Sequence, residues 1–339
     1  MENETRAERR SSNPTIGALP TALMWLACCT AILLALEHGY EGTWYPLDTI
    51  IHHPEAARPP FGYRPLFPLL ASALQSVFHS MSNHNAFIAT QVLSIGATVY
   101  LMGRWTNLFL PGFGKLLGFM LAALMLCPTI DYWTFYDIGI VGFWTACLML
   151  LYYERTVGYL LVFMLGTFNH ENSLLLVPCA VLYLWGRVKF WKLLLLTVAQ
   201  LAAWEGVRYL VVTSVHGPPG LFENHLQMNL HFWTRYSRQA IFFSGVTLLP
   251  WWCLAAIGWR YSTRLLRCAT ITLPGLFLVT LLFGSFNEAR QFDGFMPVCA
   301  GMIACWVAAV ISGPRAENGT GANTTAPQAV KVENAARAL

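Results

Sequence analysis

The sequence predicts an all-α membrane protein: a polytopic transmembrane helical bundle of about ten spans with external amphipathic helices. Three observations lead to this fold class. The chain is 56% hydrophobic and only 11% charged, whereas soluble domains carry about 25% charged residues. Apolar runs of about 16 to 22 residues recur from Leu19 to Ser312, which is long enough to cross a bilayer. None of these runs shows the strict alternation of a membrane β-barrel.

The expected helices follow these apolar runs in chain order. The polar N-terminus precedes a first run without a small-residue cleavage site, so we interpret that run as a retained span. A run over 158–186 is split by the polar tetrapeptide NHEN at 169–172, and we expect a hairpin, out at 158–168 and back at 173–186. The other spans are expected at about 20–37, 86–103, 116–131, 138–153, 192–213, 241–259, 268–284 and 291–311.

The apolar segment RPLFPLLASALQSVFHS (64–80) has two interpretations. Pro65 and Pro68 interrupt it early, which favours an interfacial or re-entrant helix on the external side. If it crosses instead, the count changes unless 158–186 is one span with Glu171 near mid-membrane. We prefer the interfacial helix.

The charges orient the bundle and divide the chain. Arg6, Arg9 and Arg10 place the N-terminus in the cytoplasm, and the later basic loops then fall on the same side. Both termini are therefore expected to be cytoplasmic. The expected parts are an N-terminal tail (1–19), a transmembrane domain (20–312) and a disordered C-terminal tail (313–339).

Nearly all acidic residues between the tails fall on the external side, in turns that are far apart in sequence. Helix packing can gather such turns around one cavity, where carboxylates abstract protons and Arg or His binds an anion. That combination suits transfer from a phosphate-linked donor to a hydroxyl. The candidate catalytic acids are Asp48, Glu41, Glu171 and Asp137; the candidate phosphate ligands are Arg64, Arg290, His52 and His53; and Glu37, Asn169, His170 and Glu288 are expected in the same cavity.

Each candidate also has a purely structural interpretation. The loop 38–63 can be a solvated loop, Asp137 can cap a helix, and Glu288 can pair with Arg290. Glu205 and Arg208, three residues apart on one span, are expected to neutralise each other.

The sequence gives little indication of cofactors. The nine cysteines lie in apolar runs without metal-ligand spacing, and adjacent histidines are a weak metal signal. We keep a divalent cation as an alternative cofactor. The formal charge of +4 requires no nucleic-acid partner.

Four stretches of the chain form a recognisable order. They are RPPFGYRPLFPLL after the first external loop, then ATQVLSIGATVYLMGRWTNLFLPGFGKLLGFMLAALMLCP, DYWTFYDIGIVGFWTACLMLLYYER and LLVFMLGTFNHENSLLLVP. In this order they resemble the GT-C superfamily of polyprenyl-phosphate-sugar-dependent membrane glycosyltransferases, and the resemblance covers about residues 20–186.

This resemblance implies an inverting transfer on the outer face of a membrane, which we expect to be the bacterial inner (plasma) membrane. The donor would be a polyprenyl-phosphate sugar, and the acceptor a glycan, a lipid or a protein. A carboxylate would act as the base, and the matching stretch offers Glu37 and Glu41, with Asp48 further on. We expect the base to be Asp48 or Glu41, with Glu171 and Arg290 supporting binding.

Other functions fit the sequence as well. A transporter would have acidic residues at mid-membrane depth and internal sequence repeats. The sequence contains no internal repeat. A non-catalytic membrane subunit of an envelope complex predicts that the external acids tolerate replacement. A polysaccharide polymerase or ligase would use a large late external loop, for which 214–240 is a modest candidate.

Overall fold

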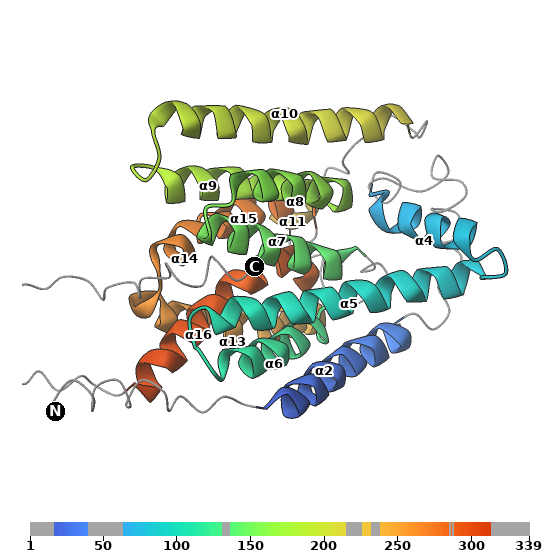
Figure 1. The fold of residues 1–339 in the computed structure, drawn as a ribbon, viewed down its shortest axis with the longest axis horizontal. Coiled ribbons are helices and arrows are strands. Elements are labelled where there is room, and N and C mark those ends of the chain that lie inside the picture. The colour runs from blue at the N-terminus through green and yellow to red at the C-terminus, as the bar shows by residue number, and fades with distance from the viewer. Residues whose placement is uncertain are drawn as a thin grey trace, which may run out of the picture.

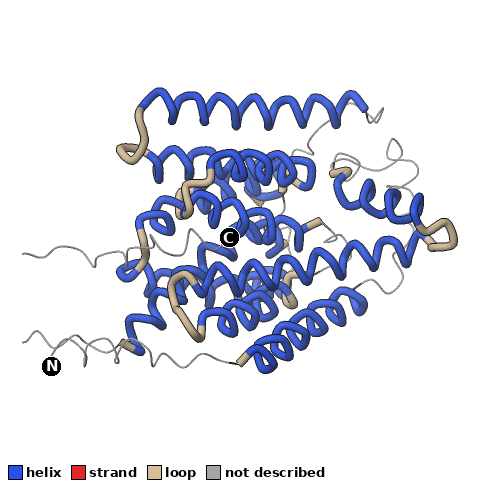
Figure 2. Tube along the Cα trace, in the orientation of Figure 1, coloured by secondary structure: helices blue, strands red, loops and turns tan. Residues whose placement is uncertain are grey.

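The computed structural model describes residues 17–39, 64–130, 136–214, 226–231, 238–284, 286 and 288–312. Within these ranges the chain forms helices joined by turns and contains no strand (Figure 2). The prediction of an all-α fold is therefore confirmed. The α-helices are α2 (Ala18–Gly39), α4 (Leu66–Val77), α5 (Asn83–Asn107), α6 (Gly114–Leu126), α7 (Asp137–Tyr152), α8 (Thr156–Asn169), α9 (Leu176–Leu184), α10 (Phe190–Ser214), α11 (Leu226–Leu230), α13 (Arg238–Gly258), α14 (Arg264–Ala269), α15 (Thr272–Phe283) and α16 (Met296–Ile311).

Short 3-10 helices join several of these elements. They are η3 (Glu171–Leu175), η4 (Trp259–Tyr261) and η5 (Ala289–Phe295). η3 leads directly into α9, and η5 leads directly into α16. Both turns carry charged residues of the candidate site.

Five helical segments of the described chain are long and apolar enough to cross a membrane. They are Ala18–Glu37, Asn83–Asn107, Phe190–Ser214, Arg264–Phe283 and Ala289–Ile311. These segments are consistent with an integral membrane protein, as the composition predicts. Five further apolar helices, α4, α6, α7, α8 and the η3–α9 segment, have 10–17 residues.

The expected hairpin over 158–186 is present. α8 ends at Asn169, η3 begins at Glu171, and α9 runs back alongside α8 (Figure 1). The NHEN turn therefore separates two helices and does not lie in the middle of one long helix, and it packs against Trp204 and Arg208 within α10.

The long helix α5 organises the packing. It packs against α2, α4, α6 and α7, and its buried Trp105 donates a hydrogen bond to the Pro297 carbonyl of α16 over 2.7 Å. Glycines permit the close contact with α6, because a Cβ on Gly118 would lie only 2.7 Å from the Cα of Gly103.

Helix α4 stands apart from the main bundle (Figure 1). It has 12 residues, which corresponds to about 18 Å of helix, too short to cross the hydrocarbon core of about 30 Å. It packs mainly on the first part of α5. These dimensions favour the interfacial or re-entrant interpretation of 64–80.

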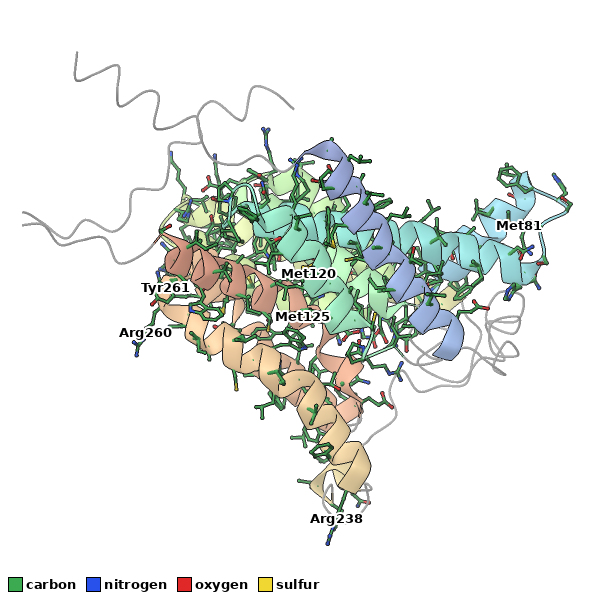
Figure 3. The ribbon with its side chains drawn as sticks, turned by 90° about the horizontal axis from the view of Figure 1, so that it is seen from below. Met81, Met120, Met125, Arg238, Arg260 and Tyr261 are labelled. Atoms are coloured by element: carbon green, nitrogen blue, oxygen red, sulfur yellow. The ribbon has the colours of Figure 1, made fainter. Side chains whose placement is uncertain are left out.

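The bundle has two distinct ends. Met81, in the turn before α5, lies at one end, while Arg260 and Tyr261 of η4 lie at the opposite end (Figure 3). We call the end that carries α4 and the turn before α5 the α4 end. The turns at η3 and η5 lie between the two ends, because η3 contacts Trp204 within α10 and η5 packs on α7, and this positions the candidate site.

Candidate functional site

Charged side chains from five parts of the chain meet inside the bundle, at the level of the first turns of α4 and α7. They lie just before α4, at the start of α7, in η3, on α10 and around η5, and three are basic and three acidic. We call this group the charged cluster; it consists of Arg64, Asp137, Glu171, Arg208, Glu288 and Arg290.

Arg64 and Glu171 form the tightest ion pair of the cluster. The Arg64 Nη2 donates to Glu171 Oε1 over 2.6 Å, and its Nε donates to Oε2 over 3.3 Å. Both side chains are almost completely buried. Paired, two-point contact of this kind fixes the orientation of both groups, so the pair ties the start of α4 to the NHEN turn.

Helix α10 adds a second cation to the same carboxylate. Arg208 Nη1 lies 3.9 Å from Glu171 Oε2, and Trp204 Nε1 donates to the Glu171 carbonyl over 3.0 Å. The expected pairing of Arg208 with Glu205 is wrong, because Arg208 is buried beside Glu171 while Glu205 is exposed. An arginine buried between helices is stabilised by a buried carboxylate more than by a solvated one.

Arg290 organises the other side of the cluster. Its Nη2 and Nε donate to Glu288 Oε2 over 2.9 and 3.2 Å, which confirms the pairing of these two neighbours. Its Nη1 also points toward Asp137 Oδ2 at 3.5 Å and the Tyr136 hydroxyl at 3.4 Å. Arg290 is therefore shared between two carboxylates.

Asp137 lies at the N-terminus of α7 but does not cap it through its side chain. The N-cap position is Tyr136, and no side-chain capping hydrogen bond is present there. The Asp137 carboxylate instead approaches Arg290, and its position in the first turn suits a negative charge. Its contacts are fewer and longer than those of Glu171.

Tyr136 joins the two halves of the cluster. The Arg64 guanidinium lies over its ring, 4.2 Å from the ring centroid, and its backbone carbonyl accepts from Asn169 Nδ2 over 2.9 Å. Burial raises the pKa of its hydroxyl above the usual value, so Tyr136 stays neutral. Asn169 thus holds α8 against the chain before α7, and its Oδ1 has no hydrogen-bond partner among the described residues.

His170 is a neutral member of the site. Its Nδ1 accepts a hydrogen bond from the Asn172 amide over 3.1 Å, so this nitrogen carries no proton. Burial, and then the charge of Arg64, lowers the pKa of His170 to about 3. Its 3.7 Å approach to Glu171 is therefore not an ion pair.

Arg64 remains charged despite its burial. Burial alone would lower the pKa of its guanidinium, but the neighbouring Glu171 carboxylate outweighs this effect and raises the pKa above its usual value. The group is thus a permanent cation at the start of α4.

A small polar cavity lies between the two arginines. It has a volume of about 10 Å³, room for about one water molecule. Arg64 and Arg290 line it from two sides, and the other polar groups around it are Tyr136, Asp137, His170, Asn172 and Gln291. The charged groups that line it are two arginines and one aspartate, so the cavity suits an anionic oxygen.

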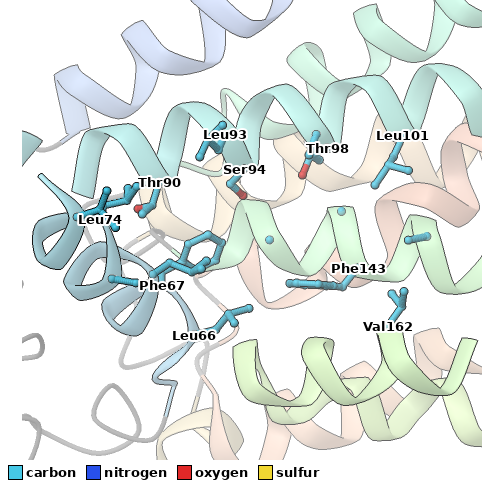
Figure 4. Close-up of a pocket in the computed structure, with 17 residues that line it drawn as sticks. Leu66, Phe67, Leu74, Thr90, Leu93, Ser94, Thr98, Leu101, Phe143 and Val162 are labelled. Carbon is cyan, nitrogen blue, oxygen red and sulfur yellow. The ribbon is translucent and has the colours of Figure 1, made fainter. Parts of the chain in front are cut away.

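A much larger apolar groove adjoins this region. It has a volume of about 490 Å³ and lies between α4, α5, α7 and α8 (Figure 4). Its walls are nearly all aliphatic or aromatic and include Leu66, Phe67, Leu93, Leu101, Phe143 and Val162. A groove of this lining suits a hydrocarbon chain.

Five further predicted residues remain, four in the loop 38–63 and one on α2. Glu41, Asp48, His52 and His53 lie outside the described residues. Glu37 is exposed near the end of α2, and no described contact connects it with the cluster.

Sequence reasoning missed several residues of the site. Arg208, Trp204 and Tyr136 were not predicted as functional, although an arginine inside a span is itself a signal of function. Asp293 of η5 is also buried beside Asp137 and Arg290, and its Oδ1 has no partner among the described residues. Within the part of the chain that the structure covers, no group of three or more His, Cys, Asp or Glu side chains could hold a metal ion.

Comparison with known proteins gives no match: no family model, no curated protein and no solved structure is significantly similar to this chain.

Proposed function

We propose that the protein is a GT-C-type membrane glycosyltransferase of about ten spans. It moves a sugar from a polyprenyl-phosphate donor to a glycan, lipid or protein acceptor on the outer face of a bacterial inner membrane, with both termini in the cytoplasm. One observation carries the proposal: two buried arginines, Arg64 and Arg290, line a polar cavity that adjoins an apolar groove. A lipid phosphate has this same combination of an anionic head and a hydrocarbon chain.

The arginines are suited to the phosphate. Arginine binds phosphate through two parallel hydrogen bonds, and both side chains are buried, where electrostatic stabilisation is strongest. The three arginines of the charged cluster already face three carboxylates. An incoming phosphate must therefore share or exchange partners with Glu171 or Glu288.

In the proposed reaction, the acceptor hydroxyl oxygen attacks the anomeric carbon of the donor sugar. The bond from that carbon to the phosphate oxygen breaks on the opposite face, and the lipid phosphate leaves with the bonding pair. The hydroxyl proton goes to a carboxylate. The product has inverted configuration at the anomeric carbon.

The base is a carboxylate with a free lone pair. Glu171 is poorly suited, because both of its oxygens accept from Arg64. Among the described residues, the Asp137 carboxylate contacts only Arg290, at 3.5 Å, and it lines the polar cavity. Our proposal keeps Asp48 or Glu41 of the first external loop as the base and makes Asp137 the next candidate.

Transfer assays with purified protein in lipid nanodiscs test this assignment. The donors are a panel of polyprenyl-phosphate sugars, and the variants are Asp48→Asn, Glu41→Gln, Asp137→Asn, Glu171→Gln and Arg290→Ala. Loss of the base should lower turnover by about 10²- to 10⁴-fold while donor binding persists. Loss of Arg290 should weaken donor binding as well.

Matched controls come from the Glu154–Arg187 pair, which is exposed at the opposite end of the bundle. Glu154→Gln and Arg187→Ala should retain wild-type turnover. If both first-loop variants retain it too, Asp137 becomes the base. If the wild type transfers no sugar from any donor in the panel, the protein is better described as a membrane subunit or transporter.

A further inference from the structure

The polar cavity and the apolar groove are close but separate. Near the start of α4, Arg64 lines the cavity, whereas Leu66 and Phe67 line the groove. In the first turn of α7, Asp137 lines the cavity and Gly139 the groove. The first turns of these two helices therefore form a common wall.

The Phe67 ring belongs to the groove side of this wall. Phe67 is buried, with 5% of its surface exposed, and it lies on the groove side in Figure 4. A Cβ on Gly139 would be 2.7 Å from the ring carbon Cε2 of Phe67 and 3.1 Å from Asn169 Nδ2. The ring thus packs directly on the backbone of α7, at the place where the two spaces would meet.

The closed wall does not accommodate a lipid phosphate. The polar cavity of about 10 Å³ holds only about one water, so a phosphate between Arg64 and Arg290 requires more room. A chain attached to that phosphate must also pass from the cavity into the groove. Phe67 lines the groove at the start of α4 and packs on Gly139, two residues after the cavity-lining Asp137, so its ring lies beside this passage.

We propose that the contact between Phe67 and Gly139 is a removable partition, which a lipid phosphate displaces when its phosphate binds at the arginines and its chain enters the groove. This inference rests on the proposed function for the identity of the ligand. Phe67 is then a specificity-determining residue, because its ring controls which chains reach the phosphate site. Arg64, three residues away, couples the partition to the anion: when Arg64 turns from Glu171 to the phosphate, the first turn of α4 moves with it.

A chain-length comparison tests the partition. The full-length protein in nanodiscs is titrated with farnesyl phosphate and with inorganic phosphate, and stopped-flow tryptophan fluorescence or native mass spectrometry follows binding. In wild type, only molecules with the ring displaced bind the lipid phosphate, which weakens its apparent affinity by the fraction in that state. If that fraction is about a tenth or less, Phe67→Ala should strengthen farnesyl phosphate binding by about tenfold or more.

Two further variants make the result specific. Phe67→Trp enlarges the partition and should weaken or slow farnesyl phosphate binding. Inorganic phosphate needs the larger cavity but no passage for a chain, so both changes should alter its binding less than they alter farnesyl phosphate binding. Arg64→Ala should weaken binding of both ligands. Phe242→Ala is the matched control, because this phenylalanine is 73% exposed on α13.

The proposal is overturned if Phe67→Ala and Phe67→Trp bind farnesyl phosphate like the wild type. It is also overturned if both variants change inorganic phosphate binding as much as farnesyl phosphate binding. Thermal unfolding shows whether each variant is folded; if Phe67→Ala is not, Phe67→Leu takes its place with the same expected direction. Farnesyl phosphate carries no sugar, so its binding does not depend on sugar transfer. The binding results therefore remain valid if the transfer assay fails.

Discussion

At the scale of single residues, the charged cluster consists of buried ion pairs, and removing one partner of such a pair lowers the stability of the fold. Glu171 faces Arg64 at 2.6 Å and Arg208 at 3.9 Å, with all three side chains mostly buried. Removing the carboxylate leaves buried positive charge uncompensated. Exposed pairs behave differently, because water and ions screen them.

We therefore expect Glu171→Gln to destabilise the protein by about 3–5 kcal/mol. Glu154→Gln should cost about 1 kcal/mol or less, because Glu154 and Arg187 are 49% and 38% exposed. Thermal or denaturant unfolding in detergent measures both. Equal effects of the two substitutions would contradict the buried pairing of Glu171.

At the scale of elements, glycines set the distance between neighbouring helices. A Cβ on Gly118 of α6 would collide with the Met102 carbonyl and the Thr106 hydroxyl of α5, and it would lie 2.7 Å from the Cα of Gly103. Backbone atoms cannot turn away as a side chain can. The contact between α5 and α6 therefore requires glycine at this position.

Gly118→Ala should destabilise the bundle by about 1–3 kcal/mol, the usual cost of overpacking a tight contact. The control is Gly206→Ala on α10, where nothing lies within 4 Å of the added methyl. That change should be neutral or slightly stabilising, since alanine has the higher helix propensity. Melting temperatures in detergent compare the two. A Gly118→Ala variant as stable as Gly206→Ala would show that the helices separate easily.

At the scale of the whole molecule, the two ends of the bundle differ in charge. The turns around 108–113, 153–155 and 185–189 lie opposite the α4 end, near the basic residues that the sequence assigns to the cytoplasm (Figure 1). The charged cluster lies toward the α4 end. If the basic end is cytoplasmic, the proposed site faces outward.

Cysteine labelling tests this orientation. Asn169 is unsuitable as a probe because it is buried and hydrogen-bonded, whereas Ser80 and Pro111 are exposed at opposite ends. In a Cys253→Ser background, which removes the exposed native thiol, a membrane-impermeant maleimide added to intact cells should label Ser80→Cys but not Pro111→Cys. Permeabilised cells provide the control. Labelling of Pro111→Cys alone would show that the protein has the opposite orientation in the membrane.

The local part of this structure follows from the sequence. Apolar runs of sufficient length require helices, because a backbone surrounded by hydrocarbon must satisfy its own hydrogen bonds. The polar tetrapeptide NHEN interrupts its apolar run, because its side chains are costly to place in hydrocarbon, and it forms the turn between α8 and α9. The pairing of Glu288 with Arg290 is local as well and could be predicted from their spacing.

Tertiary structure decided the partners of the remaining charges. Arg208 was assigned to Glu205 on its own helix, but helix packing places it beside Glu171, which is 37 residues away in the sequence. Arg64 finds Glu171 across 107 residues, and Arg290 finds Asp137 across 153. The apolar groove arises in the same way, from one side each of α4, α5, α7 and α8. The helical pattern shows which residues are apolar or charged, but only the rotation and depth of each packed helix decide which of them meet.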